Sequence, residues 1–481
     1  MNSLVWFRLD LRLADNPALD AAVKHKGPVV PVFVWAPDEE APWEPGGASC
    51  WWMHQSLLAL QSKLESVGSR LIIRRGETLA ALRQVARETG ANAIFWNRRY
   101  EPAVMARDQI IKQSLRDDGF KVESFNGALL HEPWTIENQS GKPFQVFTPF
   151  WKKCLSLPDP TESIRAPKKL PTPAKWPKSL ALDELGLEPK INWAKGFSEV
   201  WQPGEDGARA NLDRFLASAF TQYTVQRNHP GVAGTSRLSP HLHFGEITPR
   251  QIWNGVKKIA SKNGMTTASW REAQFLTEIG WREFAHHLLF HFPKTPTEPL
   301  RSSFANFPWR EDAKMLTAWQ RGQTGYPIVD AGMRELWTTG WMHNRVRMIV
   351  ASFLVKDLLT SWTEGARWFW DTLVDADLAQ NTLGWQWTAG CGTEAAPYFR
   401  VFNPVSQGKK FDPKGDYVRR WCPELAKLPD EWIHQPWLAP HDVLVRAGLE
   451  LDRNYPRPII AHNIAREVAL EAFAKTKRVL E

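Results

Sequence analysis

The 481-residue sequence is poor in cysteine and has no long apolar run. Its four cysteines, Cys50, Cys154, Cys391 and Cys422, are far apart and form no C-x-x-C pair, so zinc and iron–sulfur spacings are missing and no metal is predicted. No stretch approaches the roughly 20 apolar residues that span a bilayer, and charges interrupt the first apolar run, MNSLVWFRLDLRLADN, unlike a secretory signal. We therefore expect a cytoplasmic protein with reduced thiols and no membrane contact.

The sequence also lacks a G-x-G-x-x-G motif after its first apolar run, so the standard dinucleotide fingerprint is absent there. Tyrosine is rare, with 6 residues, whereas tryptophan is abundant, with 26. Because a buried indole N–H needs a partner, this excess either has a function of its own or reflects the packing of large helical cores. With 60 Lys and Arg against 52 Asp and Glu, the net charge of +8 suits a polyanion such as nucleic acid without requiring one.

The periodicity of apolar residues divides the chain into two domains and a linker. Up to residue 130, five short apolar runs (LVWF, PVVPVFVW, RLIIRRG, NAIFWN and KVESF) alternate with amphipathic segments, which predicts an α/β, Rossmann-like domain with a doubly wound parallel sheet. Residues 131–205 are rich in proline and charge and are expected to form a long interdomain linker. From 206 to 481 the period is 3.6 residues, which predicts an all-helical domain.

The segment GTSRLSPHLHFGEITP, residues 234–249, carries hydroxyl groups just before a helical run. Thr235, Ser236 and Ser239 would suit a phosphate or pyrophosphate, because free backbone N–H groups gather at a helix N-terminus. Serine and threonine caps also begin many helices that bind nothing, so this signal is weak by itself.

The segment LVDADLAQNTLGWQW, residues 373–387, places two carboxylates in an apolar context. Asp375 and Asp377 need partners there, and the arginines of GWMHNRVRM, residues 340–348, are candidates. An ordinary buried ion pair explains the pattern equally well.

Two further helical segments mix polar and apolar residues on one face. In GWMHNRVRM, residues Asn344, Arg345 and Met348 share a side, as expected either at the rim of a core or along a pocket. In FLTEIGWREF, residues 275–284, Glu278 and Trp281 stand three apart. An acid beside an indole is either a hydrogen-bond partner of a stacked heterocycle or a simple rim residue.

Together these segments resemble the DNA photolyase and cryptochrome family over nearly the whole chain. The resemblance is carried by VWFRLDLRLADNP, TSRLSP, WREF, TGYPIVDAGMR, GWMHNRVRM and APYFRVFNPVSQGKKFDP. The family's architecture, an α/β domain joined by a long linker to a helical FAD-binding domain, matches the organisation read from the periodicity. The resemblance implies that the cofactor is FAD and that the partner is UV-damaged DNA, bound by a monomer.

The resemblance also implies a set of cofactor contacts. The phosphates would lie against Tyr223 and the Thr235–Ser239 loop, an ion pair of Arg347 and Asp375 against the flavin ring, and Asn381 opposite the redox-active ring nitrogen. Plant and insect cryptochromes often carry Asp or Cys at that last position, so Asn381 favours repair over signalling. The implied FAD ligands are Tyr223, Thr235, Ser236, Leu238, Ser239, Arg347, Asp375, Asp377 and Asn381.

The implied activity is repair of cyclobutane pyrimidine dimers by an electron from excited, reduced FAD. Enzymes that repair the (6-4) photoproduct carry a His pair where this chain has His343 and Asn344, so the cyclobutane dimer is the expected substrate. The lesion pocket would consist of Glu278, Asn344, Met348, Trp281 and Trp387. An electron chain of Trp385, Trp362 and Trp309 would re-reduce the flavin, and DNA phosphates would meet Arg227, Arg345, Arg400 and Lys410.

The segments NTLGW, CWWMHQSL, WNRRYEP and FTPFW look most like class III bacterial photolyases, with a class I-like enzyme as the alternative. That branch implies a 5,10-methenyltetrahydrofolate antenna in the α/β domain, with 8-hydroxy-deazaflavin as the alternative. Trp51 and Glu101 are candidate antenna contacts, but we commit to neither. The rival function is a signalling cryptochrome, which the absence of an extended tail after AREVALEAFAKTKRVLE disfavours, and the α/β domain alone would also fit an unrelated nucleotide-binding enzyme.

Overall fold

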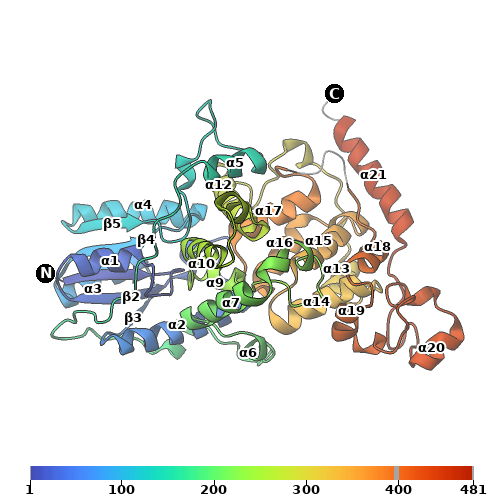
Figure 1. The fold of residues 1–481 in the computed structure, drawn as a ribbon, viewed down its shortest axis with the longest axis horizontal. Helices are drawn as coiled ribbons and strands as arrows, with labels where there is room; N and C mark the ends of the chain where they lie inside the picture. Colours follow the sequence, from blue (N-terminus) through green and yellow to red (C-terminus); the bar gives the residue numbers. More distant parts are fainter. Residues whose placement is uncertain (1, 395–399, 479–481) are drawn as a thin grey trace.

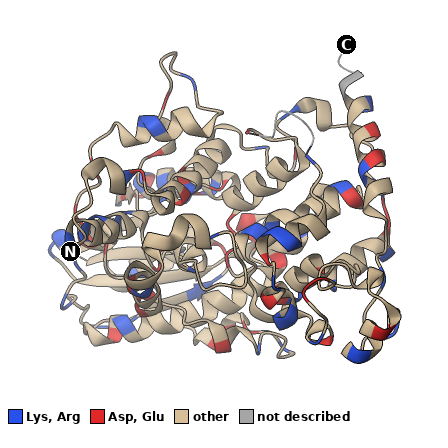
Figure 2. Cartoon of the chain, turned by 45° about the vertical axis from the view of Figure 1, so that its right-hand side comes forward, with Lys and Arg blue, Asp and Glu red and all other residues tan. Residues whose placement is uncertain are grey.

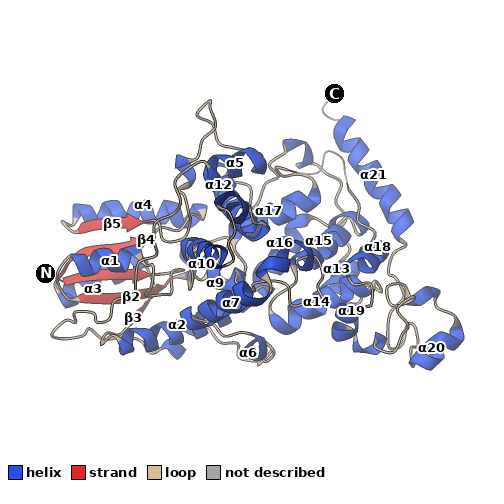
Figure 3. Cartoon of the chain, viewed as in Figure 1, coloured by secondary structure: helices blue, strands red, loops and turns tan. Residues whose placement is uncertain are grey.

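The computed structural model describes residues 2–394 and 400–478 and gathers the strands of its sheet at one end of the molecule (Figures 1 and 3). The five strands are parallel and lie in the order β3-β2-β1-β4-β5. They are β1 (Asn2–Phe7), β2 (Val29–Trp35), β3 (Ile72–Arg75), β4 (Ala91–Asn97) and β5 (Lys121–Phe125). The order reverses between β1 and β4, which opens a crevice for a ligand at the carboxyl ends of these strands.

Helices cover both faces of the sheet because alternate strand residues point to opposite sides. Val5 and Phe7 of β1 belong to one buried cluster, together with α1 (Pro17–Lys24) and α2 (Gly47–Ser66). Leu4 and Trp6 belong to another, together with α3 (Thr78–Thr89) and α4 (Pro102–Asp117). The predicted doubly wound α/β domain is therefore confirmed.

Residues 131–205 form four short helical segments in an otherwise irregular path. These segments are η2 (Pro133–Thr135), α5 (Phe147–Leu155), η3 (Leu182–Leu185) and α6 (Phe197–Val200). The apolar face of α5 packs against α12 (Gln274–His291) through Phe147, Phe150 and Trp151. Much of this segment is thus folded onto the helical region, and its exact limits as a linker remain predictions.

The rest of the chain is helical, as predicted. Its α-helices besides α12 are α7 (Glu205–Ser218), α8 (Tyr223–Gln226), α9 (Ser239–His243), α10 (Pro249–Lys262), α11 (Thr267–Arg271), α13 (Ala313–Gln320), α14 (Pro327–Thr339), α15 (Asn344–Ser352), α16 (Trp362–Thr372), α17 (Leu378–Ala389), α18 (Pro404–Phe411), α19 (Asp416–Trp421), α20 (His441–Ala447) and α21 (His462–Arg478). Short 3-10 turns are η4 (Phe220–Gln222), η5 (Ser302–Phe304), η7 (Pro423–Leu425) and η8 (Pro436–Leu438), and η6 (Phe353–Asp357) is a π-helical segment that follows α15 directly. Among the described residues, no helix is both long and apolar enough to cross a membrane.

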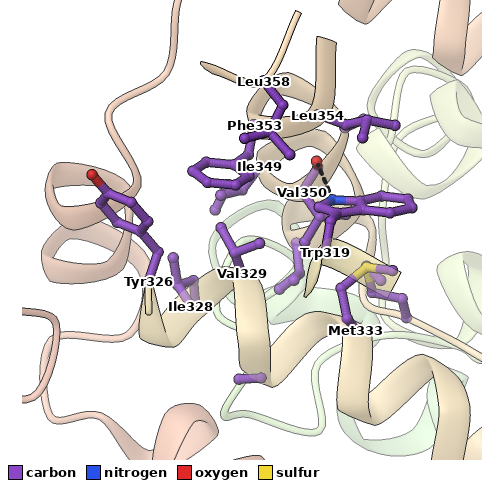
Figure 4. Close-up of a cluster of buried hydrophobic side chains, with 14 of the residues drawn as sticks. Trp319, Tyr326, Ile328, Val329, Met333, Ile349, Val350, Phe353, Leu354 and Leu358 are labelled. Atoms are coloured by element: carbon purple, nitrogen blue, oxygen red, sulfur yellow. Dashed lines mark hydrogen bonds between the residues drawn. The ribbon is translucent and has the colours of Figure 1, made fainter. Parts of the chain in front are cut away.

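The core of the helical region fixes the position of α15. Trp319 is fully buried there and donates its indole N–H to the carbonyl of Val350 at 3.0 Å (Figure 4). A Cβ on Gly332 of α14 would lie 2.4 Å from Val346, so a glycine is needed for α14 and α15 to pack this closely. Gly340 then ends α14 with a positive φ of 67°, and the chain turns directly into α15.

Candidate active site

Two adjoining cavities, of about 450 and 250 Å³, lie between α8, α12, α15 and α17. Both are lined by Glu278, Asn344, Arg347, Asp375 and Gln380. The larger cavity is also lined by Arg227, Trp281, Arg345, Met348, Asn381, Trp385 and Trp387. The smaller cavity is also lined by Tyr223, Ser236, Leu238, Ser239 and Asp377.

Most of the residues singled out in the sequence thus meet at these two cavities, although they come from distant segments. The predicted cofactor ligands all line one or the other except Thr235, which precedes Ser236 in the same loop. The five predicted lesion-pocket residues line the larger cavity. Trp362, Trp309, Arg400 and Lys410 do not line either one.

Arg347 and Asp375 form an ion pair at the boundary of the two cavities. Arg347 Nη2 lies 3.0 and 2.8 Å from the two carboxylate oxygens, and its Nε donates to the Met342 carbonyl at 2.8 Å. The Asp375 side chain is 3% exposed, so its charge depends on this partner. The pair presents a fixed cation and a fixed anion side by side, which suits a polar heterocycle lying across it.

Asp377 caps α17 and lies between two histidines. Its Oδ1 accepts a hydrogen bond from the N–H of Gln380 at 2.9 Å, and its Oδ2 lies 3.4 Å from His286 and 4.0 Å from His243. Burial alone would raise the pKa of this carboxyl, but His286, Arg282 and His243 lower it below its usual value. Asp377 is therefore a carboxylate, held in place at the wall of the smaller cavity.

The Thr235–Ser239 loop reaches the smaller cavity with its hydroxyl groups. Ser239 accepts a hydrogen bond from the indole N–H of Trp341 at 3.2 Å. Across the cavity, burial raises the pKa of Tyr223, so its hydroxyl keeps its proton and can donate. The Nε2 atom of Gln380 is also buried and has no hydrogen-bond partner among the described residues, although the side chain lines both cavities. An unpaired buried donor among hydroxyls and an ion pair fits a large polar cofactor such as FAD.

The larger cavity has an aromatic wall that is stacked on the linker. Trp281 lies flat on Phe147 of α5, with ring centroids 3.8 Å apart and planes inclined by 9°. Trp387 lines the same cavity from α17. Asn381 donates its amide to the Ala366 carbonyl at 3.0 Å, so its Oδ1 oxygen is left for a bound group. Open space surrounds Gly384, one turn further along α17.

Glu278 is paired with a predicted DNA-binding residue. It accepts a hydrogen bond from Arg227 Nη1 and another, at 2.7 Å, from Gln274 Nε2, both at its Oε1 oxygen. The two side chains of the ion pair remain partly exposed, at 19% for Arg227 and 27% for Glu278.

Further cations lie around the larger cavity. Arg345 donates to Asn228 Oδ1 at 2.6 Å, and its guanidinium lies 4.4 Å from the ring centroid of Phe411. Lys410 lies over the same ring at 5.3 Å. Figure 2 shows that Lys and Arg are interspersed with Asp and Glu in the part of the chain that the structure describes. The backbone carbonyl of Arg400 accepts a hydrogen bond from Lys356. The preceding motif residues, 395–399, lie outside the described part of the chain.

The three predicted electron-transfer tryptophans differ in their relation to the larger cavity. Trp385 lines that cavity and is 2% exposed, Trp362 is 3% exposed in the same buried cluster, and Trp309 is partly buried at its edge. A Cβ on Gly365 would lie 2.1 Å from Trp385, so the helix that begins with Trp362 packs directly on it. Trp319, which was not predicted, also contacts Trp385 at a centroid distance of 6.3 Å.

A third cavity, of about 190 Å³, lies between the α/β domain and the helical region. Arg99, which follows β4, donates to Glu40 at 2.6 and 2.9 Å and to Glu101 at 2.9 Å. Trp43 and Trp370 add an edge-to-face aromatic pair at 5.4 Å. Glu101 is among the residues that line this cavity, whereas Trp51 is buried in α2 against Phe197 and does not line it.

Some site residues were missed by sequence reasoning. Gln380 lies three residues after Asp377 and next to Asn381 on the first turn of α17, so helical spacing could have identified it. Phe147 and Arg99 gave no such signal, because Phe147 stacks on Trp281 and Arg99 bonds Glu40, and both partners lie far away in the sequence.

Comparisons with known proteins agree with this geometry. The family model "DNA photolyase" matches residues 3–174, and "FAD binding domain of DNA photolyase" matches residues 275–475. The chain is 52% identical to a deoxyribodipyrimidine photo-lyase of Agrobacterium fabrum, covering 99% of this chain and 98% of the relative. It is 43% identical to cryptochrome-1 of Arabidopsis thaliana, covering 98% of this chain and 70% of that protein. The crystal structure of a bacterial class III photolyase from Agrobacterium tumefaciens superposes with a TM-score of 0.95 at 51% identity, covering 99% of this chain and 98% of that one.

Proposed function

The chain belongs to the DNA photolyase and cryptochrome family, and on this basis we propose that it repairs cyclobutane pyrimidine dimers in DNA with blue light. The observation that supports this best is the larger cavity, which is lined by Glu278, by the indoles of Trp281 and Trp387 and by the Arg347–Asp375 pair. The test is blue-light repair, under reducing conditions, of one oligonucleotide with a cyclobutane thymine dimer and another with a (6-4) photoproduct. Restoration of the first alone supports the proposal, and restoration of neither contradicts it.

FAD would be bound in the smaller cavity and across the ion pair. Reduced FAD, when bound and excited by light, supplies the single electron that opens the cyclobutane ring and then returns. The hydroxyls of the Thr235–Ser239 loop and of Tyr223 would hold the phosphates, and Arg347 with Asp375 would orient the ring. Asn381 would offer its Oδ1 oxygen to the ring edge, because its amide N–H groups face α16.

The larger cavity would take a dimer that has left the duplex. A dimer already weakens its own base pairing, so flipping it out costs less than the few kcal/mol of a normal base. Trp281 and Trp387 would stack on it, and each stacking contact is worth on the order of 1–3 kcal/mol. Glu278 would hydrogen-bond a thymine edge, and Asn344 and Met348 would close the remaining wall.

His343 supports the choice of the cyclobutane dimer over the (6-4) photoproduct. Burial, together with the charges of Arg345 and Arg347, lowers the pKa of His343 to about 3. Its Nδ1 accepts a hydrogen bond from the backbone of Arg345 as the cap of α15. The imidazole is therefore neutral at pH 7 and unsuited to donate a proton to a lesion.

The cations around the larger cavity would bind the phosphates of the damaged strand. Arg227 and Arg345 line it, Lys410 lies beside Arg345 on Phe411, and Arg400 completes the predicted set. Because each neutralised phosphate releases counterions, the affinity should fall steeply with salt.

The third cavity would hold the antenna, for which we propose 5,10-methenyltetrahydrofolate over 8-hydroxy-deazaflavin. Its position at the carboxyl ends of β2 and β4 is where parallel sheets bind ligands. Trp43 and Trp370 offer aromatic surface for a pterin. Extraction of the chromophore from protein purified with its natural cofactors, followed by mass spectrometry, distinguishes the two molecules.

The alternative function, blue-light signalling, is kept open by the identity to a plant cryptochrome. Failure to repair either lesion, with FAD bound and photoreducible, would favour it. We also propose that the protein acts as a monomer in the bacterial cytoplasm, which light scattering of the purified protein with and without damaged DNA tests for the oligomeric state.

A further inference from the structure

The ion pair between Arg227 and Glu278 joins two residues with opposite tasks in the proposed function. Arg227, directly after α8, is expected to attract a DNA phosphate, whereas Glu278, on the second turn of α12, is expected to hydrogen-bond a thymine. The structure places the guanidinium and the carboxylate in direct contact. A phosphate that approaches Arg227 therefore also approaches a negative charge.

The contact leaves unused binding capacity on both side chains. Glu278 accepts both of its hydrogen bonds at Oε1, and its Oε2 has no partner among the described residues. Arg227 donates to Glu278 through Nη1, and within the described part of the chain its Nη2 and Nε make no hydrogen bond. Oε2 can thus receive an N–H from a bound base while Nη2 and Nε meet a phosphate.

The neighbouring Arg345 does not share this arrangement. Its guanidinium bonds the neutral Asn228 and Met348, and no described carboxylate pairs with it. Burial and the charge of Arg227 both lower the pKa of Arg345, so the two cations repel each other across the cavity mouth. Of the two predicted DNA-binding arginines that line the larger cavity, Arg227 has its charge offset by a carboxylate in the described structure, whereas Arg345 does not.

Resting on the proposed function, we propose that the Arg227–Glu278 pair determines specificity by weakening the binding of undamaged DNA. An undamaged strand brings its phosphate to Arg227 but keeps its bases stacked in the duplex, so nothing compensates for the repulsion between the phosphate and Glu278. A dimer that enters the cavity offers the N3–H groups of its thymines, which Oε2 of Glu278 accepts. The carboxylate therefore weakens the binding of every strand, and only a damaged strand gains a hydrogen bond to Oε2 in return.

The test measures the binding of an undamaged oligonucleotide and of the same oligonucleotide with a dimer, in the dark, over a range of salt concentrations. Glu278→Gln removes the negative charge and keeps the shape. We expect it to bind undamaged DNA about two- to fivefold more tightly, as expected for release of one partly exposed ion pair. Its log K against log salt should steepen by up to about 0.9, the equivalent of one additional neutralised phosphate.

Four further variants make the result specific. Arg227→Gln should bind undamaged DNA more weakly with a shallower slope, and Arg227→Gln combined with Glu278→Gln should not regain the tighter binding of Glu278→Gln. Glu278→Asp keeps the charge and should keep the discrimination. Gln274→Leu removes the neutral donor to the same Oε1 oxygen and should leave the salt slope unchanged.

The outcomes separate this inference from the proposed function. A wild-type protein that prefers damaged DNA, together with a Glu278→Gln variant that binds undamaged DNA no more tightly, overturns the role of the pair and leaves repair intact. A wild-type protein that does not prefer damaged DNA and repairs nothing overturns the proposed function itself.

Discussion

The indole of Trp281 stacks on the phenyl ring of Phe147, with the ring centroids 3.8 Å apart. Trp281 lies on α12 and lines the larger cavity, whereas Phe147 begins α5 and does not line it. One face of the indole is thereby occupied, and the orientation of the other is fixed before any base arrives. A residue of the segment that joins the domains thus supports the surface on which the dimer is expected to stack.

The first prediction concerns this support. Phe147→Leu should weaken the binding of dimer-containing DNA about three- to tenfold, since an aromatic pair is worth ~0.5–1.5 kcal/mol. Binding of undamaged DNA should not change, because it does not use the indole. Fluorescence anisotropy with the two oligonucleotides measures both affinities. Phe144→Leu, in the same cluster but without a contact to Trp281, is the control. Equal losses in the two variants would mean that the effect is one of stability alone.

The second prediction concerns Glu278. Glu278→Ala should keep FAD, because the FAD phosphates and ring are expected to contact other residues. Its repair yield per photon absorbed should fall about two- to tenfold, in line with the ~0.5–1.5 kcal/mol of one hydrogen bond. The yield is measured at saturating enzyme, so that altered DNA affinity does not enter. An unchanged yield under these conditions would remove Glu278 from the chemistry and leave it a role in binding alone.

The third prediction concerns the pH dependence of stability at the third cavity. Burial alone would raise the pKa of Glu101, but Arg99 lowers it from 4.5 to about 2. Because the folded state binds this proton less readily than the unfolded state, the stabilisation is present above pH 4.5 and is lost as the pH falls toward 2. Its size is on the order of 2–3 kcal/mol.

Denaturant unfolding of wild type and Glu101→Gln at several pH values checks this expectation. The wild type should be the more stable protein at pH 6, and the difference should shrink steadily on acidification. Glu123→Gln, at a half-exposed glutamate that pairs with Lys121 outside the cavity, is the control. A difference that stays constant from pH 6 to pH 3 would show that Glu101 contributes through its shape and not through its charge.

The sequence was sufficient for the fold because the signals are local. The five apolar runs that were predicted to be strands form β1 to β5. The segments with a 3.6-residue period after residue 206 form helices. The motifs likewise identified Asp375 and Arg347, whose pairing the structure shows. The contact between Arg227 and Glu278 could not be read in the same way, since 51 positions separate them and each sits in a pattern that is complete without the other. The same holds for Phe147 beneath Trp281.

The last prediction concerns Trp385, which lines the larger cavity and packs against the helix that begins with Trp362. Trp385→Phe should slow the light-driven reduction of oxidised FAD, because the proposed chain loses its first member. Repair by chemically pre-reduced enzyme should remain largely intact, since the chain re-reduces the flavin and does not act in ring opening. The growth of the reduced-flavin absorption under blue light with a thiol reductant measures the first effect.

Trp337→Phe, which alters a 53% exposed indole outside the proposed chain, is the matched control. Unaltered photoreduction in Trp385→Phe would mean that the electron enters without Trp385. Slow reduction in Trp385→Phe but normal reduction in Trp362→Phe would instead retain Trp385 and implicate Trp319, an indole that contacts Trp385.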